Sequence, residues 1–358
     1  MSIKKIAKEA GVSTATVSRV LNNPGYKCSS EELRERIWKI ARELNYMPNE
    51  AARNLKKGIT DTSQKVWYLD VLMTRTGNLE TDPFFSELLR VIESEIHRQG
   101  CILMHIFHQP LFSNDRKCRT ENIDKVIAQM EPDGDIRSDG LIIIGKCNDN
   151  VLKKLSAKYK SIVSVNRNST NYLVDEVICD GKRIAALAVE YLIGLGHRKI
   201  GYVGDCHNES RYKGYQDTLF HYGIDMDISY VIEAEHTEAE GYAVMERLIQ
   251  RGDAPTAIYC ANDMIAIGML KCLNKYKNHY YVPSIISSDD IEEAQYTKPM
   301  LTTVRLPKEE MGKFALYLLI DRLGGGHKGI VWTELEGKLM IRESCTLVEN
   351  ANRMEYYI

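Results

Sequence analysis

The chain has 358 residues, more than a single domain of typical size and enough for two or three domains. It is 44% apolar and 27% charged, an ordinary globular composition that argues against global disorder. Its longest apolar runs fall far short of the roughly 18–20 residues that span a bilayer, which argues against a transmembrane helix. Its nine cysteines are dispersed and show no zinc-ligand spacing, which argues against a disulfide framework and a metal centre.

Charge is distributed unevenly along the chain. Residues 1–60 hold 12 Lys and Arg against 6 Asp and Glu, a balance of +6, and the rest of the chain has a balance of −8. A small basic head on a larger acidic body predicts that the head meets a polyanion, the alternative being an accidental imbalance. The first nine residues carry charges where an export signal needs an apolar core, so we expect a cytoplasmic protein.

Two short helices are predicted in the head. Apolar residues recur at helical spacing over residues 3–10, and Gly11 can take the left-handed conformation that ends a helix. Ser13 is a good N-cap for a second helix over residues 14–22. Its apolar stripe is Val17, Val20 and Leu21, and its polar side is Ala15, Ser18, Arg19 and Asn22. Two helices joined by a short turn containing glycine predict a helix-turn-helix, whose second helix fits the major groove of DNA.

A third helix follows in the head. Ser29 and Glu32 have the spacing of a capping box. Leu33, Ile37, Ile40 and Leu44 then recur on one face, which predicts a stripe directed at the core. Three short helices would give this head its own small core.

From about residue 61 the pattern alternates between strands and helices. The predicted strands are Val66–Met73, Cys101–Phe107, Gly140–Ile144, Ser161–Val165, Val177–Cys179, Ile200–Val203, Ala257–Cys260 and Ile285–Ser287. Amphipathic helices fill the intervals, and one of them begins near Pro307 and ends at Gly324–Gly326. Residues 109–138 are expected to form a long polar connection. This βα alternation predicts an α/β fold of doubly wound parallel sheets.

Ligands of doubly wound folds bind at the carboxyl ends of the strands, so polar residues that follow strands are candidate contacts. These residues are Asn166, Arg167, Arg211, Asn262, Asp263, Asp289 and Asp290. The alternatives are structural, because Asn or Asp can cap the following helix and Arg can pair at the surface.

Five segments resemble the lactose/galactose repressor (LacI/GalR) family of bacterial transcriptional regulators. They are residues 3–22, 44–55, 194–204, 261–268 and 301–305. The resemblance covers nearly the whole chain, and its N-terminal block is highly specific.

The resemblance implies roles for residues of the head. Thr14 and Ala15 match positions that read bases, and Thr16 and Arg19 match positions that contact phosphate or base edges. Leu55, at the end of a hinge helix over residues 49–55, matches the wedge that enters the minor groove; the alternative is that it packs onto the body. The predicted DNA-binding set is Ser13, Thr14, Ala15, Thr16, Ser18, Arg19, Asn22, Asn49, Ala52 and Leu55.

The resemblance also implies how the body is organised. Its fold would be two lobes similar to periplasmic sugar-binding proteins, crossed three times by the chain. The expected domains are a head over 1–48, a hinge and linker over 49–61, an effector-binding and dimerisation domain over 62–349, and a tail over 350–358. Lobe 1 is expected at about 62–165 and 292–323, and lobe 2 at about 166–291 and 324–349. Implied effector contacts are Arg211, Asn262, Asp289, His236 and Asn166, with His236 at a position that is often an aromatic stacking residue.

The sequence therefore predicts a homodimeric repressor that binds a pseudopalindromic operator in double-stranded DNA. A small polar effector, with a sugar favoured, would control it, and no cofactor or membrane partner is expected. A sugar-binding protein without regulatory role is the alternative. An enzyme is not expected, because the chain has no Gly-x-Gly-x-x-Gly after a strand, no Gly-x-Ser-x-Gly, no Walker loop and no His-Glu-x-x-His.

Overall fold

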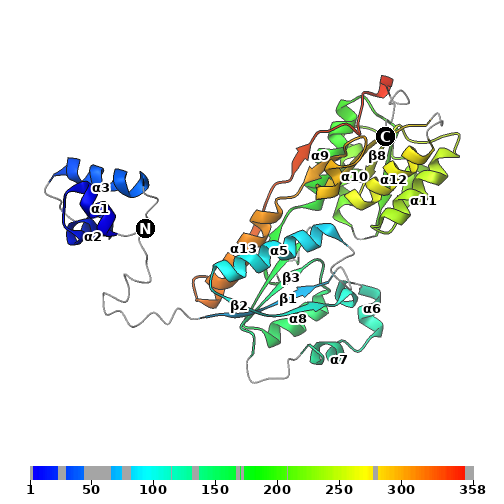
Figure 1. Ribbon diagram of the computed structural model, residues 1–358. Helices are drawn as coiled ribbons and strands as arrows, with labels where there is room; N and C mark the ends of the chain where they lie inside the picture. Colours follow the sequence, from blue (N-terminus) through cyan, green and yellow to red (C-terminus); the bar gives the residue numbers. More distant parts are fainter. Residues whose placement is uncertain are drawn as a thin grey trace. The chain divides into compact units, whose positions relative to one another are not determined.

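The computed structural model (Figure 1) describes residues 3–22, 30–43, 66–74, 82–113, 115–130, 137–166, 170, 173–207, 209–276 and 281–350. Two compact units divide the chain, Met1–Val66 and Trp67–Ile358. Within the described ranges, no helix combines the length and the apolar character needed to cross a bilayer.

The first unit contains three helices, α1 (Ile3–Ala10), α2 (Thr14–Asn22) and α3 (Glu31–Glu43). The predicted bounds 3–10 and 14–22 are confirmed. Ser30 caps α3, because its Oγ accepts a hydrogen bond from the backbone N–H of Leu33 at 3.2 Å; the predicted cap, Ser29, lies outside the described residues. The three helices meet in a small core of Ile6, Ala7, Ala10, Val17, Val20 and Ile37.

The second unit is built on two six-stranded sheets, which define two lobes (Figure 1). The first lobe has the order β11-β5-β4-β3-β1-β2, with all strands parallel: β1 (Tyr68–Met73), β2 (Ile102–His108), β3 (Gly140–Ile144), β4 (Ser161–Asn166), β5 (Asp175–Ile178) and β11 (Trp332–Glu334). Its central strand β3 is a continuous apolar run because both faces of the sheet are covered by helices. The predicted α/β class with parallel sheets is confirmed.

Helices cover both faces of the first sheet. Helix α13 (Lys308–Leu323) packs on α5 (Pro83–Arg98) and against β3, β4 and β5. On the other face lie α7 (Ile123–Ala128), α8 (Asp149–Lys158) and the 3-10 turn η1 (Pro110–Ser113), followed by α6 (Asp115–Thr120). The expectation of a long polar connection over residues 109–138 is wrong for its described part, because Phe112, Ile123 and Ile127 are buried against the sheet.

The second lobe has the order β12-β10-β9-β8-β6-β7, in which only β12 is antiparallel to its neighbour. Its strands are β6 (Ile200–Gly204), β7 (Val231–Glu233), β8 (Ala257–Cys260), β9 (Ser284–Asp289), β10 (Thr302–Arg305) and β12 (Lys338–Met340). Its helices are α9 (Gly181–Gly194), α10 (Ser210–His221), α11 (Glu238–Ile249) and α12 (Asp263–Lys275), with the 3-10 turns η2 (Ile228–Tyr230), η3 (Glu292–Gln295) and η4 (Val348–Asn350). Helix α9 pairs with α10, and α11 pairs with α12.

Among the described residues the chain changes lobe at three places: between β5 and α9, between β10 and α13, and between β11 and β12. Each change lies later in the chain than the expected lobe limits of 165, 291 and 323. The reason is that β5 pairs with β4 in the first sheet, β10 pairs with β9 in the second, and β11 pairs with β5 in the first. Pairing of parallel strands is non-local, so these limits could not be read from local patterns.

Helices α11 and α12 touch backbone to backbone through two glycines. A Cβ at Gly268 would lie 2.0 Å from the carbonyl oxygen of Glu238, and a Cβ at Gly241 would lie 2.0 Å from that of Ile265. We expect Gly268→Ala to destabilise the second unit by at least about 2 kcal/mol, because the helices must move apart. Urea unfolding measures this loss, with Gly194→Ala as the control, since a Cβ on that helical glycine meets nothing within 4 Å. A Gly268→Ala protein as stable as the control would contradict this packing.

Candidate DNA interface and effector site

The start of α2 is fixed by the side chain of Ser13. Its Oγ accepts a hydrogen bond from the backbone N–H of Thr16 at 3.1 Å and lies 2.9 Å from the Thr16 hydroxyl. The preceding turn contains Gly11 at φ 67°, a left-handed conformation that glycine adopts without strain. These two features set the direction in which α2 leaves the turn.

The inner face of α2 is anchored in the core of the first unit. Val17 and Val20 are buried, and Arg36 of α3 donates a hydrogen bond to the carbonyl of Ala10 at the end of α1, at 2.8 Å. Thr14 and Arg19 lie on the exposed side of α2, and Thr16 is half-buried. A polar outer surface on a rigid helix is the form that reads a DNA groove.

The remaining predicted DNA contacts cannot be placed. The side chains of Ala15, Ser18 and Asn22 lie outside the description of α2, and Asn49, Ala52 and Leu55 lie outside the described residues altogether. The hinge helix therefore stays a prediction.

Four of the five predicted effector contacts follow successive strands of the second sheet at its carboxyl edge. Arg211 lies in the first turn of α10 after β6, His236 follows β7, Asn262 follows β8, and Asp289 ends β9. Asn262 Nδ2 donates to the carbonyl of His236 at 3.3 Å, and Arg211 donates to the carbonyl of Ala261, the residue before Asn262. The fifth, Asn166, ends β4 in the first sheet, where its carbonyl accepts from Cys179 N–H at 3.3 Å.

Arg211 is buried, with 1% of its surface exposed, and its guanidinium is held by Glu209. The Nε of Arg211 donates to Glu209 Oε1 at 2.9 Å, and Nη2 donates to Oε2 at 3.1 Å, so the carboxylate occupies both donors of the guanidinium fork. Burial by itself would lower the pKa of Arg211, but the carboxylates of Glu209 and Asp289 raise it instead. The arginine is therefore a permanently charged centre of this edge.

Asn262 acts as the N-cap of α12. Its Oδ1 accepts from the backbone N–H of Ile265 at 3.1 Å, while its Nδ2 holds the loop of His236. The structure thus shows the helix-capping role that was the alternative for Asn262. The cap uses Oδ1 and the loop contact uses one hydrogen of Nδ2, so the second Nδ2 hydrogen can still be donated to a ligand.

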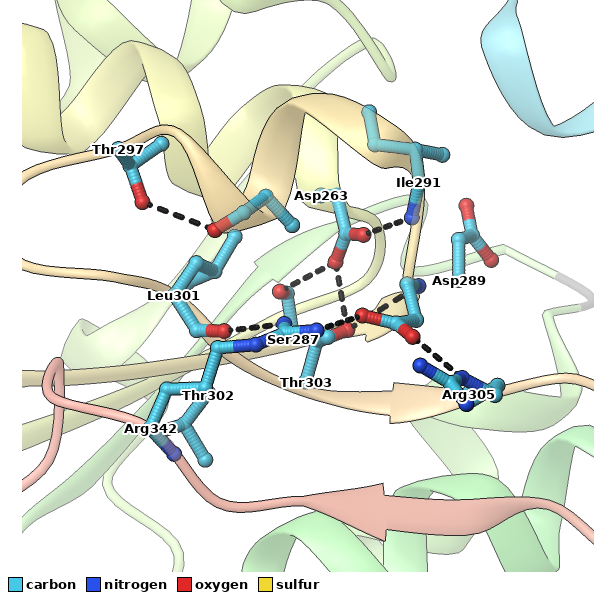
Figure 2. Close-up of polar contacts among 12 residues, drawn as sticks. Asp263, Ser287, Asp289, Ile291, Thr297, Leu301, Thr302, Thr303, Arg305 and Arg342 are labelled. Atoms are coloured by element: carbon cyan, nitrogen blue, oxygen red, sulfur yellow. Dashed lines mark hydrogen bonds and ion pairs between the residues drawn. The ribbon is translucent and has the colours of Figure 1, made fainter.

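Asp263, the next residue, is fully buried and joins three elements (Figure 2). Its Oδ1 accepts from the hydroxyls of Ser287 on β9 and Thr303 on β10, both at 2.6 Å, and its Oδ2 accepts from Ile291 N–H at 2.8 Å. Burial, with a further contribution from the Asp289 carboxylate, raises the pKa of Asp263 to about 7.

These contacts support a strained turn at Asp289 and Asp290. Both residues have positive φ, 128° and 49°, which is rare outside glycine and typical of functional sites. The Asp290 carboxylate accepts from Arg305 and from Arg342, each at 2.5 Å, and both arginines are drawn in Figure 2. The turn that carries Asp289 is therefore held in place by the hydrogen bond from Ile291 to Asp263 and by the ion pairs of Asp290.

Lys308 links this turn to the first lobe. It is the first residue of α13, where the chain crosses from β10, and its ammonium donates to the carbonyl of Asp290 at 3.0 Å. The same ammonium pairs with Glu87 of α5 at 2.5 Å and lies 5.7 Å from the centre of the Phe84 ring. A displacement of the Asp289–Asp290 turn would therefore change the contact of Lys308 with α5.

Sequence reasoning missed Glu209 and Lys308 and considered Asp263 only as a position after a strand. The signal for Glu209 was its place two residues before Arg211, at the N-cap of α10. Nothing in the sequence marked Lys308, because its partners lie on two other elements.

Comparison with known proteins places these features in context. The family model described as bacterial regulatory proteins, lacI family, matches residues 2–49, and the model of a periplasmic binding protein-like domain matches residues 189–345. The HTH-type transcriptional repressor MelR of Bacillus subtilis (strain 168) is 31% identical over 96% of this chain and 97% of its own length. The HTH-type transcriptional repressor PurR of Mannheimia succiniciproducens is 29% identical over 96% and 98%.

Solved structures share the fold. A complex of the transcriptional regulator CelR with cellobiose has a TM-score of 0.65 at 23% identity, covering 96% of this chain and 100% of that one. The lac repressor dimer bound to operator and the anti-inducer ONPF has a TM-score of 0.64 at 23% identity, covering 97% and 99%. A LacI family regulator from Enterococcus faecium with bound ribose has a TM-score of 0.64 at 24% identity, covering 78% and 99%.

Proposed function

The chain belongs to the lacI family of bacterial regulatory proteins, so it is a DNA-binding transcriptional regulator and not an enzyme. We propose that it is a homodimeric, cytoplasmic repressor whose operator affinity is controlled by a small polar effector. The observation that carries this proposal is the folded helix-turn-helix head joined to a two-lobed unit with polar residues at the edge of its second sheet. The head disfavours the alternative, a sugar-binding protein without a regulatory role.

The proposed operator is pseudopalindromic. Each head places α2 in one major-groove half-site, with Thr14 and Ala15 near bases and Thr16 and Arg19 near phosphate or base edges. Two such half-sites require two heads, which is why we propose a homodimer. The proposed hinge helix over residues 49–55, with Leu55 as a minor-groove wedge, would add contacts to a bent duplex.

The proposed effector is a sugar bound between the lobes. Arg211, Asn262 and Asp289 offer fixed polar groups at the carboxyl edge of the second sheet, and Asn166 offers another from the first. Relatives whose structures hold cellobiose or ribose favour a sugar.

The proposed coupling uses the lobe crossovers. An effector that engages Asp289 alters the turn to which Lys308 is bound, and Lys308 transmits this to Glu87 on α5 of the first lobe. Rotation of the lobes then changes how the hinges are presented to DNA. Such coupling is typically about 1–3 kcal/mol and must be reciprocal, so an effector that weakens operator binding is itself bound more weakly by the operator complex.

We expect Arg19→Ala to weaken operator binding and to reduce the slope of log affinity against log salt by about 1, because one phosphate contact is lost. Fluorescence anisotropy over a salt series measures both quantities. The control is Lys271→Ala, which removes an exposed cation of α12 in the second unit. An Arg19→Ala protein with the affinity and slope of the control would remove Arg19 from the interface.

A screen of sugars and nucleobases by thermal shift tests the regulatory proposal. A true effector at 100 times its Kd should stabilise the second unit by about 2.7 kcal/mol. Each compound that stabilises the protein is then titrated into the operator complex. Ligands that bind in the screen and leave operator affinity unchanged would contradict effector control.

A further inference from the structure

The groups that contact the Arg211 guanidinium restrict the charge of the effector that this site can bind. A guanidinium recognises a phosphate or carboxylate through two parallel N–H donors on one edge. In this chain the Nε/Nη2 edge of Arg211 is already filled by Glu209, two residues earlier, at 2.9 and 3.1 Å. The third contact of the guanidinium, from Nη1, goes to the carbonyl of Ala261.

We propose that the effector is uncharged and that Glu209 is the residue that excludes anions, such as phosphorylated sugars, sugar acids and nucleotides. This inference rests on the proposed function, since it describes the same site. It assigns to Glu209 a selectivity that the site residues predicted from the sequence do not provide.

Burial makes the exclusion effective. The side chains of Arg211 and Glu209 are 1% and 8% exposed, and Asp289 is 2% exposed. The Asp289 carboxylate also acts electrostatically on Arg211, so the charge of one guanidinium is opposed by two carboxylates. An incoming anion would add a third negative charge in a region that water screens poorly. A neutral polyol meets no such cost, because carboxylates accept hydrogen bonds from hydroxyl groups.

The other cations described near the Asp289–Asp290 turn are also paired with carboxylates. Arg305 and Arg342 both hold Asp290, and Lys308 holds Glu87 and the carbonyl of Asp290. An anion bound by one of these side chains would compete with the carboxylate that already pairs with it. The Glu209–Arg211 pair differs from these ion pairs, because it is formed by a predicted effector residue, Arg211.

Glu209→Gln tests the inference with little change in shape. The glutamine retains an oxygen that can accept from the N–H of Arg211, the contact by which Glu209 caps α10, while the negative charge is removed. We expect sulfate, the probe, to bind Glu209→Gln at least 10-fold more tightly than wild type in isothermal calorimetry. Glu209→Asp, which keeps the charge, should exclude sulfate as wild type does.

The matched control is Glu336→Gln. Glu336 also pairs with an arginine, Arg183, at 2.5 Å, but its side chain is 76% exposed and lies at the third crossover. This variant should gain no sulfate affinity. Circular dichroism melting checks that all three variants are folded.

A second arm compares glucose with glucose 6-phosphate, and ribose with ribose 5-phosphate, on the wild-type full-length protein. We expect no phosphorylated member to bind more tightly than its neutral partner. A phosphorylated member that does so, or a Glu209→Gln protein with unchanged sulfate affinity, would overturn the inference. If none of the four sugars binds, the sulfate arm alone decides. A neutral sugar that binds without changing operator affinity counts against the proposed function and leaves the exclusion of anions intact.

Discussion

Val17→Asp should abolish sequence-specific operator binding and leave the second unit folded. Val17 is fully buried where α2 meets α1 and α3. A carboxylate there has no partner among the six buried apolar side chains of this core, and a domain this small has little stability in reserve. Since specific binding typically exceeds non-specific binding by about 10³ or more, we expect operator affinity to fall by at least that factor.

Anisotropy with the operator measures the loss of affinity, and calorimetry shows whether the unfolding transition of residues 67–358 is kept. Leu347→Asp is the matched control, because it places the same carboxylate on a side chain that is 52% exposed in the second unit. That variant should bind operator as wild type does. A Val17→Asp protein that still discriminates operator from random DNA would show that the head does not work as described.

Asp263→Ala should have the largest effect on the second unit, a loss of about 3–5 kcal/mol of unfolding free energy. The substitution leaves the hydroxyls of Ser287 and Thr303 and the N–H of Ile291 without their buried acceptor, and each such group costs about 1–3 kcal/mol. It also releases the turn that carries Asp289, so effector binding should be lost. Denaturant unfolding and calorimetry measure the two effects.

Asp149→Ala is a close control for this variant. Asp149 is the first residue of α8 and follows an asparagine cap, as Asp263 does in α12, but its side chain is exposed. Both substitutions remove a carboxylate from a helix N-terminus, and only one removes buried acceptors. Equal losses in the two variants would contradict the role assigned to Asp263.

Asp263→Asn separates the charge of this residue from its hydrogen bonds. A carboxyl whose pKa is raised by folding is held in its protonated form, so its favourable contribution is full below the ordinary pKa near 4 and is lost as pH rises to about 7. Wild-type stability should therefore fall over this window, and the asparagine variant should show a flatter profile. Parallel profiles for the two proteins would show that Asp263 does not titrate there.

The parts of the fold that sequence analysis predicted correctly depend on local signals. Helices 3–10 and 14–22 are marked by apolar spacing, Gly11 and Ser13, and β3 is marked by a run of isoleucines. Strands β7, β10, β11 and β12 were missed, because each has only three or four residues and none has a continuous apolar run. Their place in a sheet is decided by partners far along the chain.

The sequence led to residues at the strand ends of the second sheet, but not to most of the contacts that these residues make. The rule that ligands bind at strand ends led to Arg211, Asn262 and Asp289, and in the structure these residues follow or end strands at one edge of the second sheet. The Glu209 pair is local and has a weak signal in the spacing of the two residues. The hydrogen bonds of Asp263 and the bridge of Lys308 join residues far apart in the chain, and sequence spacing contains no information on such contacts.

Selection from a pool of random double-stranded oligonucleotides at low ionic strength shows whether the head of this protein reads a DNA sequence. The full-length protein should enrich a sequence with two-fold symmetry, and a ligand found by thermal shift should change its affinity for that sequence. If the protein has an intact three-helix head and enriches no sequence from the pool, the DNA-reading role of the head is contradicted.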